Sequence, residues 1–322
     1  MSLTSETAPL SLPRPETSGG QPRRVGVELE FSGITEQKVI DTVRTAFGGT
    51  ARETGSGRWE LSDSELGGFT CFLDSRPLEK LDREGLGRQL RDLARTVVPV
   101  ELVTDPLQVA DIARLDGVLD TLRRAGATGT RAGVLLGFGL HFNPEVVAPT
   151  LDGVLPTMTA YALIEDHIRQ IADIDVSRRV LPWVDPWPRA LLDRLADPDH
   201  PVTGLKGLID IYLRLAPSRN HGLDMLPFFA HADRTRVARV MDMEQIGARP
   251  TYHWRLPDCR IDEPNWTIAG EWNRWVLVER VAGDAALLDR LKAAWRDHRA
   301  SFTSMRADWA SRSGRMLREA GL

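Results

Sequence analysis

Two glutamates one residue apart, Glu28 and Glu30, stand in the segment GVELEFSG at 26–33, which has the pattern of a β-strand. Successive side chains of a strand point to opposite faces. Glu28 and Glu30 therefore share one face with Gly26, and apolar residues at 25, 27, 29 and 31 share the other. Three or more carboxylates packed together resist being charged without a cation, and carboxylates are ligands that Mg²⁺ takes. Taken alone, however, the pair could also belong to a solvated strand face.

The same alternation gives other predicted strands a polar face of similar chemistry. An ordinary solvated face would carry Thr, Lys, Ser and Gln, whereas these faces repeat Glu, His, Arg and Gly. Glycine weakens a strand unless something must approach its backbone closely. The set predicts a floor for metal-bound phosphates, and its members are Glu60, Glu101, His141, Asn143, His253 and Arg255.

The polar face of any one of these strands is as consistent with a plain solvated surface as with a binding site. A single histidine such as His141 or His253 is more often structural than a ligand. Arg249 and Arg219 are further candidates for anion contacts, although surface arginines in loops are about as common. The recurrence over several strands is what favours a binding face.

The order of the expected strands and helices that would position these residues predicts an α+β domain with a mostly antiparallel, curved sheet. Helices would pack on one face, and the other face would line a cleft. Strands and helices do not alternate in a βαβ rhythm, and the sequence has no GxGxxG turn or Walker loop. The expected strands are 25–31, 57–62, 68–75, 98–104, 133–143 and 251–258, and the expected helices are 35–47 with Thr35 as N-cap, 82–96, 108–125, several within 151–245, and two over 265–321.

Composition bounds the class of protein. The 322 residues carry a net charge of -4 and 42% hydrophobic residues, which is typical of a globular protein and not of a nucleic-acid binder. We found no apolar run of membrane-spanning length and no signal peptide, so a cytoplasmic location is expected. Residues 1–22 are rich in Ser, Thr, Pro and Gly and predict a disordered arm.

Four motifs span about residues 23–260, in the order RRVGVELEFSG, VPVELVTDPL, GFGLHFN and RPTYHWRLPD. The resemblance that they carry is to the amidoligase family, ATP-dependent carboxylate–amine ligases related to glutamine synthetase and glutamate–cysteine ligase. It implies a glutamine-synthetase-like catalytic domain over 23–264, with a helical insertion at about 151–245. The helices of 265–322 would pack on the same domain.

The resemblance also implies roles for single residues. Glu28 and Glu30 match an acidic pair that binds two Mg²⁺ or Mn²⁺ ions with ATP, and Glu101 matches a further metal ligand. His141 matches a histidine that supports the nucleotide phosphate and the metal. Arg255 matches an arginine that contacts the transferred phosphate.

Two positions depart from the family pattern. The family has a second histidine where this chain has Asn143, and a glutamate metal ligand where it has His253. Histidine can still ligate, but it is neutral and softer. A shift toward Mn²⁺, a smaller metal count and an impaired enzyme all remain open.

The implied reaction joins a carboxylate to an amine, on small molecules or peptides, through an acyl phosphate. Glu60 or Asp63 is a candidate base for the incoming ammonium, and Arg249, Asn143, His141 and Arg255 are candidates for nucleotide contacts. A different phosphoryl-transfer enzyme of the same architecture, such as a guanidino kinase, and a nucleotide- or metal-binding relative without turnover are the alternatives. We expect Glu28→Gln and Glu30→Gln each to abolish Mg²⁺-ATP binding or turnover.

Overall fold

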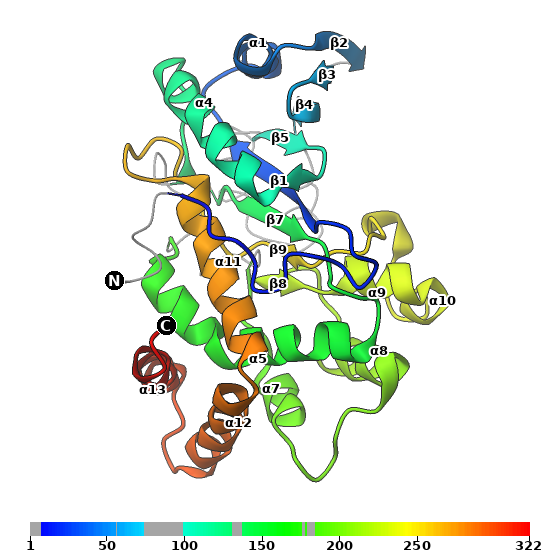
Figure 1. Cartoon of the computed structure of the whole chain (residues 1–322), viewed down its shortest axis with the longest axis vertical. Coiled ribbons are helices and arrows are strands. Elements are labelled where there is room, and N and C mark those ends of the chain that lie inside the picture. The colour runs from blue at the N-terminus through cyan, green and yellow to red at the C-terminus, as the bar shows by residue number, and fades with distance from the viewer. Residues whose placement is uncertain (1–7, 56, 74–98, 131–136, 176–177, 179–183) are drawn as a thin grey trace, which may run out of the picture.

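A computed structural model provides the structure of the chain (Figure 1). It describes residues 8–55, 57–73, 99–130, 137–175, 178 and 184–322. The helix predicted at 82–96 and the first part of the strand predicted at 133–143 lie outside these residues.

One mostly antiparallel sheet organises the fold, as the sequence predicts. Among the described residues it has nine strands, with the order β2-β3-β4-β5-β1-β7-β9-β8 and with β6 paired to β1. Every pairing between named strands is antiparallel. The strands are β1 (Arg24–Phe31), β2 (Thr50–Gly55), β3 (Arg58–Ser64), β4 (Gly67–Leu73), β5 (Val100–Thr104), β6 (Leu107–Gln108), β7 (Leu140–Pro144), β8 (Leu223–Asp224) and β9 (His253–Trp254).

Helices cover one face of the sheet, and further helices pack on that helical layer (Figure 1). They are α1 (Glu36–Phe47), α4 (Ile112–Arg124), α5 (Leu151–Ala172), α7 (Arg189–Leu195), α8 (Gly204–Leu215), α9 (Leu226–Ala232), α10 (Arg234–Val237), α11 (Ile268–Gly283), α12 (Ala285–Ala300) and α13 (Arg306–Glu319). Helix α1 begins as predicted, because the Thr35 hydroxyl accepts a hydrogen bond from the Lys38 amide. Within the described part of the chain, no helix has both the length and the apolarity that a bilayer crossing requires.

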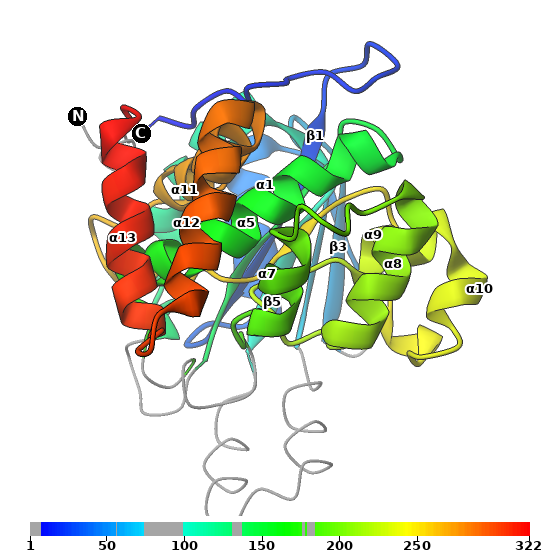
Figure 2. The same ribbon diagram turned by 90° about the horizontal axis from the view of Figure 1, so that it is seen from below.

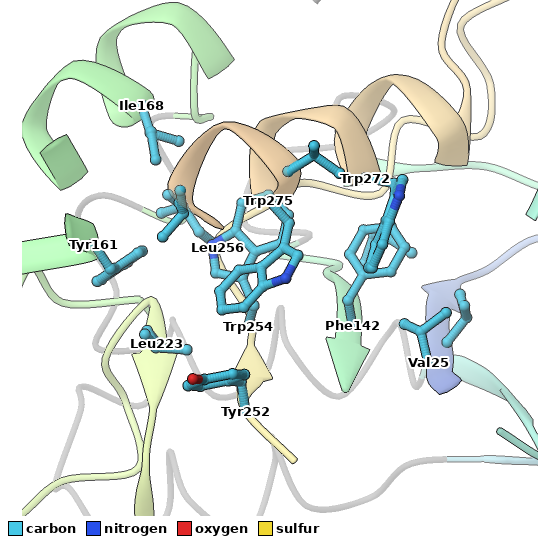
Figure 3. Packing of buried hydrophobic residues seen from close by; sticks show 14 of the residues in the cluster. Val25, Phe142, Tyr161, Ile168, Leu223, Tyr252, Trp254, Leu256, Trp272 and Trp275 are labelled. Carbon is cyan, nitrogen blue, oxygen red and sulfur yellow. The ribbon is translucent and has the colours of Figure 1, made fainter. Parts of the chain in front are cut away.

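The apolar face of the central strands is closed by α11. Val25, Val27, Leu29 and Phe31 of β1 have no exposed surface. Figure 3 shows the α11 tryptophans over the neighbouring strands: the ring of Trp272 lies 5.6 Å from Phe142, and that of Trp275 lies 5.7 Å from Trp254. Burial of a large side chain contributes about 1.5–3 kcal/mol. This core fixes the face of each strand and leaves the polar alternates on the opposite side.

The C-terminal segment forms three helices, α11, α12 and α13, so the prediction of two over 265–321 is wrong. The chain breaks at Asp284, whose carboxylate accepts a hydrogen bond from the Leu287 amide and so begins α12. A second break precedes α13. Helices α12 and α13 contact each other and α5 (Figure 2).

The 151–245 segment is not purely helical, since it contributes β8 at the edge of the sheet. The strand predicted at 251–258 is shorter than expected. Only His253–Trp254 forms regular β9, and Thr251 and Asp258 make isolated bridges to Glu145 and Gly139. Pro250 and Pro257 lack the amide proton that regular pairing needs.

Residues 8–22, for which the composition predicts a disordered arm, make defined contacts, and the first of them run beside α11 (dark blue in Figure 1). The Asn273 side chain accepts from the Leu10 amide at 2.8 Å and donates to the Ala8 carbonyl at 3.0 Å. The Trp272 indole donates to the Leu10 carbonyl, and Leu12 is buried. Side chains of a distant helix thus supply the partners that local composition does not reveal.

Candidate functional site

The polar residues singled out in the sequence meet where β5, β1, β7 and β9 lie side by side. Register places His141 opposite Glu28 and Asn143 opposite Gly26. Phe142 pairs with Trp254, and antiparallel pairing therefore sets His141 opposite Arg255 and Asn143 opposite His253. Strand alternation thus predicted the correct shared face, and the strand order makes these residues neighbours.

Glu28 is the centre of the cluster. The Asn143 amide nitrogen donates to its Oε1 at 2.7 Å, and His141 Nδ1 lies 3.2 Å from its Oε2. The Arg249 guanidinium lies 3.5 Å from Oε1. Burial opposes ionisation of Glu28, but the hydrogen bond with His141 and the charge of Arg249 hold the pKa of this carboxyl well below its usual range. Glu28 is therefore a carboxylate at neutral pH.

Asn143 links Glu28 to His253 and Arg249. Its Oδ1 lies 2.8 Å from His253 Nδ1 and accepts from Arg249 Nη2 at 2.5 Å and Nε at 3.2 Å. Burial lowers the pKa of His253 well below its ordinary value, and the charge of Arg249 acts in the same direction against the pull of Glu28. The His253 imidazole is therefore neutral, which is the form that can ligate a metal.

His141 also faces the second glutamate, with its Nε2 3.7 Å from Glu30 Oε1. The Gly139 amide donates to the other oxygen, Glu30 Oε2, at 2.7 Å. A Cβ on Gly139 would stand 2.5 Å from His141 Nε2, so only glycine permits this close approach. A Cβ on Gly26 would meet Asn143 at an ordinary 3.5 Å. Contacts with the protein's own atoms therefore require glycine at position 139 but not at position 26.

Glu101 lies directly across from Glu30 on β5 and is buried. Cross-strand partners share a face, so two carboxylate side chains stand opposite each other at this edge of the cluster. Like charges in that arrangement are destabilising. A bound cation would offset this repulsion.

The cluster fits a divalent cation. One ligand atom each from Glu28, His141 and His253 lie within 4.8 Å of one another. A carboxylate oxygen and two imidazole nitrogens are common ligands of first-row divalent ions. Glu30 and Glu101 extend this set on the β5 side, so all the metal ligands expected from the sequence lie on adjoining strands.

Arg255 stands beside the cluster with two further arginines. Its Nη1 donates to the Arg219 carbonyl at 2.7 Å, while its Nε is buried without a hydrogen-bond partner. Burial, followed by repulsion from Arg219, lowers the pKa of Arg255. The group nevertheless stays charged at neutral pH. A buried guanidinium in this setting favours an anion.

Arg178 was not found from the sequence, because it lies in a segment without a strand pattern. Its guanidinium donates to the carbonyls of Arg255, Leu256 and Pro257 and to the Asp258 carboxylate. It therefore supports the backbone that carries Arg255. No local signal in the sequence marks this role.

The candidate bases Glu60 and Asp63 are not brought to the cluster. Glu60 lies on β3, three strands from β1 in the sheet order, which is a separation of about 14 Å at the usual strand spacing. Its carboxylate accepts from Thr54 Oγ1 at 3.3 Å. Asp63 is exposed and left-handed, with φ of 57°, at an irregularity between β3 and β4. We assign neither of them a role in the cluster.

Comparison with known families places this arrangement in context. The model of the family described as "Putative amidoligase enzyme" matches residues 21–277, which include every residue of the cluster. The chain belongs to this amidoligase family. Neither the curated proteins nor the solved structures that were compared with the chain gave a match.

Proposed function

We propose that the protein is an ATP-dependent ligase that joins a carboxylate to an amine, with divalent metal ions holding ATP on the polar face of the sheet. The observation that carries the proposal is Glu28, an ionised carboxylate. One of its oxygens and one ring nitrogen each of His141 and His253 lie within 4.8 Å of one another. Family membership supplies the reaction class. The substrates would be small molecules or peptides that carry a carboxylate and an amine.

Each group in the cluster suits a separate task in such a reaction. Glu28, His141 and His253, with Glu30 and Glu101, would hold the metal ions, which when bound neutralise phosphate charge. Arg255 would contact the transferred phosphoryl group, because its buried guanidinium has hydrogen-bonding capacity left. Arg249, about one-third exposed and fixed on Asn143, would contact the nucleotide phosphates from the rim.

The chemistry proposed is acyl activation. A carboxylate oxygen of the first substrate attacks the γ-phosphorus of ATP, and ADP leaves. The amine nitrogen then attacks the acyl carbon, the C–O bond to phosphate breaks, and the ammonium proton is lost to solvent or to a base. Fixed positive charge would stabilise the moving phosphoryl group in the first step.

Oxygen transfer tests this sequence of bonds. The protein is incubated with ATP, Mg²⁺ or Mn²⁺, a pool of ¹⁸O-carboxyl amino acids and dipeptides, and ammonium or hydroxylamine. The proposal expects ADP release that requires both the carboxylate and the amine, and one ¹⁸O in the phosphate released. A stable phosphorylated acceptor formed without amine would instead identify a kinase. ATP binding without ADP release from any pool would identify a binding protein without turnover.

Two glutamate variants localise the reaction. Glu28→Gln is expected to lower Mn²⁺-ATP affinity by more than the roughly 10- to 100-fold that loss of an outer-shell metal partner costs. Glu65→Gln is the control, because Glu65 is two-thirds exposed and pairs with Arg114 on the surface. Equal affinity in the two variants would show that the nucleotide site lies elsewhere.

A further inference from the structure

The Asn143 side chain has a single orientation that fits its neighbours. Its Nδ2 faces Glu28 Oε1 at 2.7 Å, and a carboxylate oxygen can only accept. Its Oδ1 faces Arg249 Nη2 at 2.5 Å, and a guanidinium can only donate. Two independent partners thus place the amide oxygen toward β9 and the amide nitrogen toward β1.

This orientation decides where the proton of His253 lies. The amide oxygen of Asn143 stands 2.8 Å from His253 Nδ1 and can only accept, so Nδ1 carries the proton. Arg249 Nη2 lies 3.1 Å from the same Nδ1 because both nitrogens donate to Oδ1 of Asn143. The opposite tautomer would set two acceptors against each other. An uncharged His253 imidazole with this proton on Nδ1 has its lone pair on Nε2.

The second imidazole obeys the same rule. His141 Nδ1 lies 3.2 Å from a carboxylate oxygen of Glu28, which again assigns the proton to Nδ1. Its Nε2 lies 3.7 Å from Glu30 Oε1. The rings of His141 and His253 stand perpendicular with centroids 5.3 Å apart. One ligand atom each of Glu28, His141 and His253 lie within 4.8 Å of one another.

We propose that Asn143 is a positioning residue that fixes the Nδ1–H tautomer of His253, so that Nε2 of His253 is the nitrogen left to bind a nitrogen-preferring divalent ion in the cluster with Glu28 and His141. Two imidazoles and one carboxylate favour Mn²⁺, Co²⁺ or Zn²⁺ over Mg²⁺, which prefers an all-oxygen shell. The inference deepens the proposed function, since it concerns the same site. Its test uses the metal alone, without ATP or substrate.

Titration with Co²⁺ and with Mg²⁺ measures this preference. The wild-type protein is expected to bind Co²⁺ more tightly than Mg²⁺ and to show a visible absorption band from nitrogen ligation. Asn143→Leu keeps the side-chain volume but removes both hydrogen-bonding groups. It is expected to lower Co²⁺ affinity by roughly 10- to 100-fold, as is typical when an outer-shell partner is lost.

Asn273→Leu is the matched control. Asn273 is also a fully buried asparagine with hydrogen bonds, but it holds the N-terminal arm on α11. The substitution should cost stability and leave Co²⁺ affinity unchanged. An equal loss in the two variants would mean that Asn143 acts only through the fold, and would overturn the proposal.

Nitrogen NMR of ¹⁵N-histidine reads the tautomer directly, with the His253 signals assigned from His253→Gln. The metal-free protein should show His253 protonated on Nδ1, and Asn143→Leu should abolish that preference, whereas Asn273→Leu should keep it. A proton on Nε2 in the wild type, or no Co²⁺ binding at all, would sink the inference. Co²⁺ binding with the expected tautomer but no ADP release would leave it standing and reject only the ligase.

Discussion

Asn143 and His253 stand opposite each other on β7 and β9, with the amide oxygen of one 2.8 Å from Nδ1 of the other. The resemblance described in the sequence analysis implies histidine at the first position and glutamate at the second. The two residues that this chain has instead contact each other, so we treat them as one coupled pair. In this chain the imidazole stands on β9, and the amide oxygen of the residue across from it accepts a hydrogen bond from its Nδ1–H.

A variant in which only one member of the pair is changed to the residue expected from the family should be less stable than the wild type. His253→Glu alone would set a carboxylate against the amide oxygen of Asn143, so we expect a loss of about 1–3 kcal/mol in the free energy of unfolding of the metal-free protein. The double variant Asn143→His with His253→Glu supplies a donor and should recover most of that loss. It should also shift the metal preference toward Mg²⁺. Urea unfolding and calorimetric titration measure the two effects.

A coupled pair requires that the stability losses of the two single variants do not add in the double variant. If the losses of Asn143→His and His253→Glu simply added in the double variant, the two positions would be independent.

Strand alternation predicted which residues share a face but not how far apart they lie. Glu28 and His141 are both on the polar face and on adjacent strands, and they touch. Glu60 is on the same face by the same rule, yet β4 and β5 separate its strand from β1. Strand order arises from contacts between distant segments, which a local pattern does not contain.

The N-terminal arm and the orientation of Asn143 escaped prediction for the same reason. Residues 8–22 have a disordered composition, but the backbone at Ala8 and Leu10 is held by Asn273, more than 250 positions away in the sequence. Asn143 reads as a weaker substitute for a histidine until Glu28 and Arg249 are seen to fix its amide. Such roles depend on partners and not on residue type.

Gly139→Ala and Gly26→Ala should differ sharply. The new Cβ at 139 would stand 2.5 Å from His141 Nε2, so the imidazole must turn away from Glu28 and Glu30. The Cβ at 26 would meet Asn143 at 3.5 Å, an ordinary contact. We therefore expect Gly139→Ala to lower Co²⁺ affinity by roughly 10- to 100-fold, and Gly26→Ala to change it little. Equal effects would show that crowding at Gly139 does not decide the position of His141.

Removal of the arm should loosen the core behind the site. A chain that begins at residue 21 lacks Leu12 and the hydrogen bonds of residues 8–10 to Trp272 and Asn273. We expect a loss of about 2–4 kcal/mol in the free energy of unfolding, from one buried leucine and these hydrogen bonds. A chain that begins at residue 8 keeps these contacts and is the control. Equal stability of the two chains would contradict a structural role for the arm.

Asp116 should give the protein a pH-dependent stability. Its two carboxylate oxygens accept from the Ile268 and Ala269 amides at 2.6 and 3.0 Å, which ties α4 to the first turn of α11. Burial raises the pKa of Asp116 to about 6, although these hydrogen bonds oppose the rise. In the unfolded chain an aspartate has a pKa of about 3.9. Between these values the folded protein binds more protons than the unfolded chain does, so the contribution of Asp116 to stability falls as pH rises from about 4 through about 6.

The variant Asp116→Asn removes this titration and keeps one acceptor. Its free energy of unfolding relative to the wild type should therefore increase with pH, by roughly 2–3 kcal/mol between pH 4 and pH 7. Urea unfolding followed by tryptophan fluorescence across this range measures the difference, with Asp289→Asn, three-quarters exposed on α12, as the control. A difference that falls with pH would mean that the two amide hydrogen bonds outweigh burial and hold Asp116 ionised.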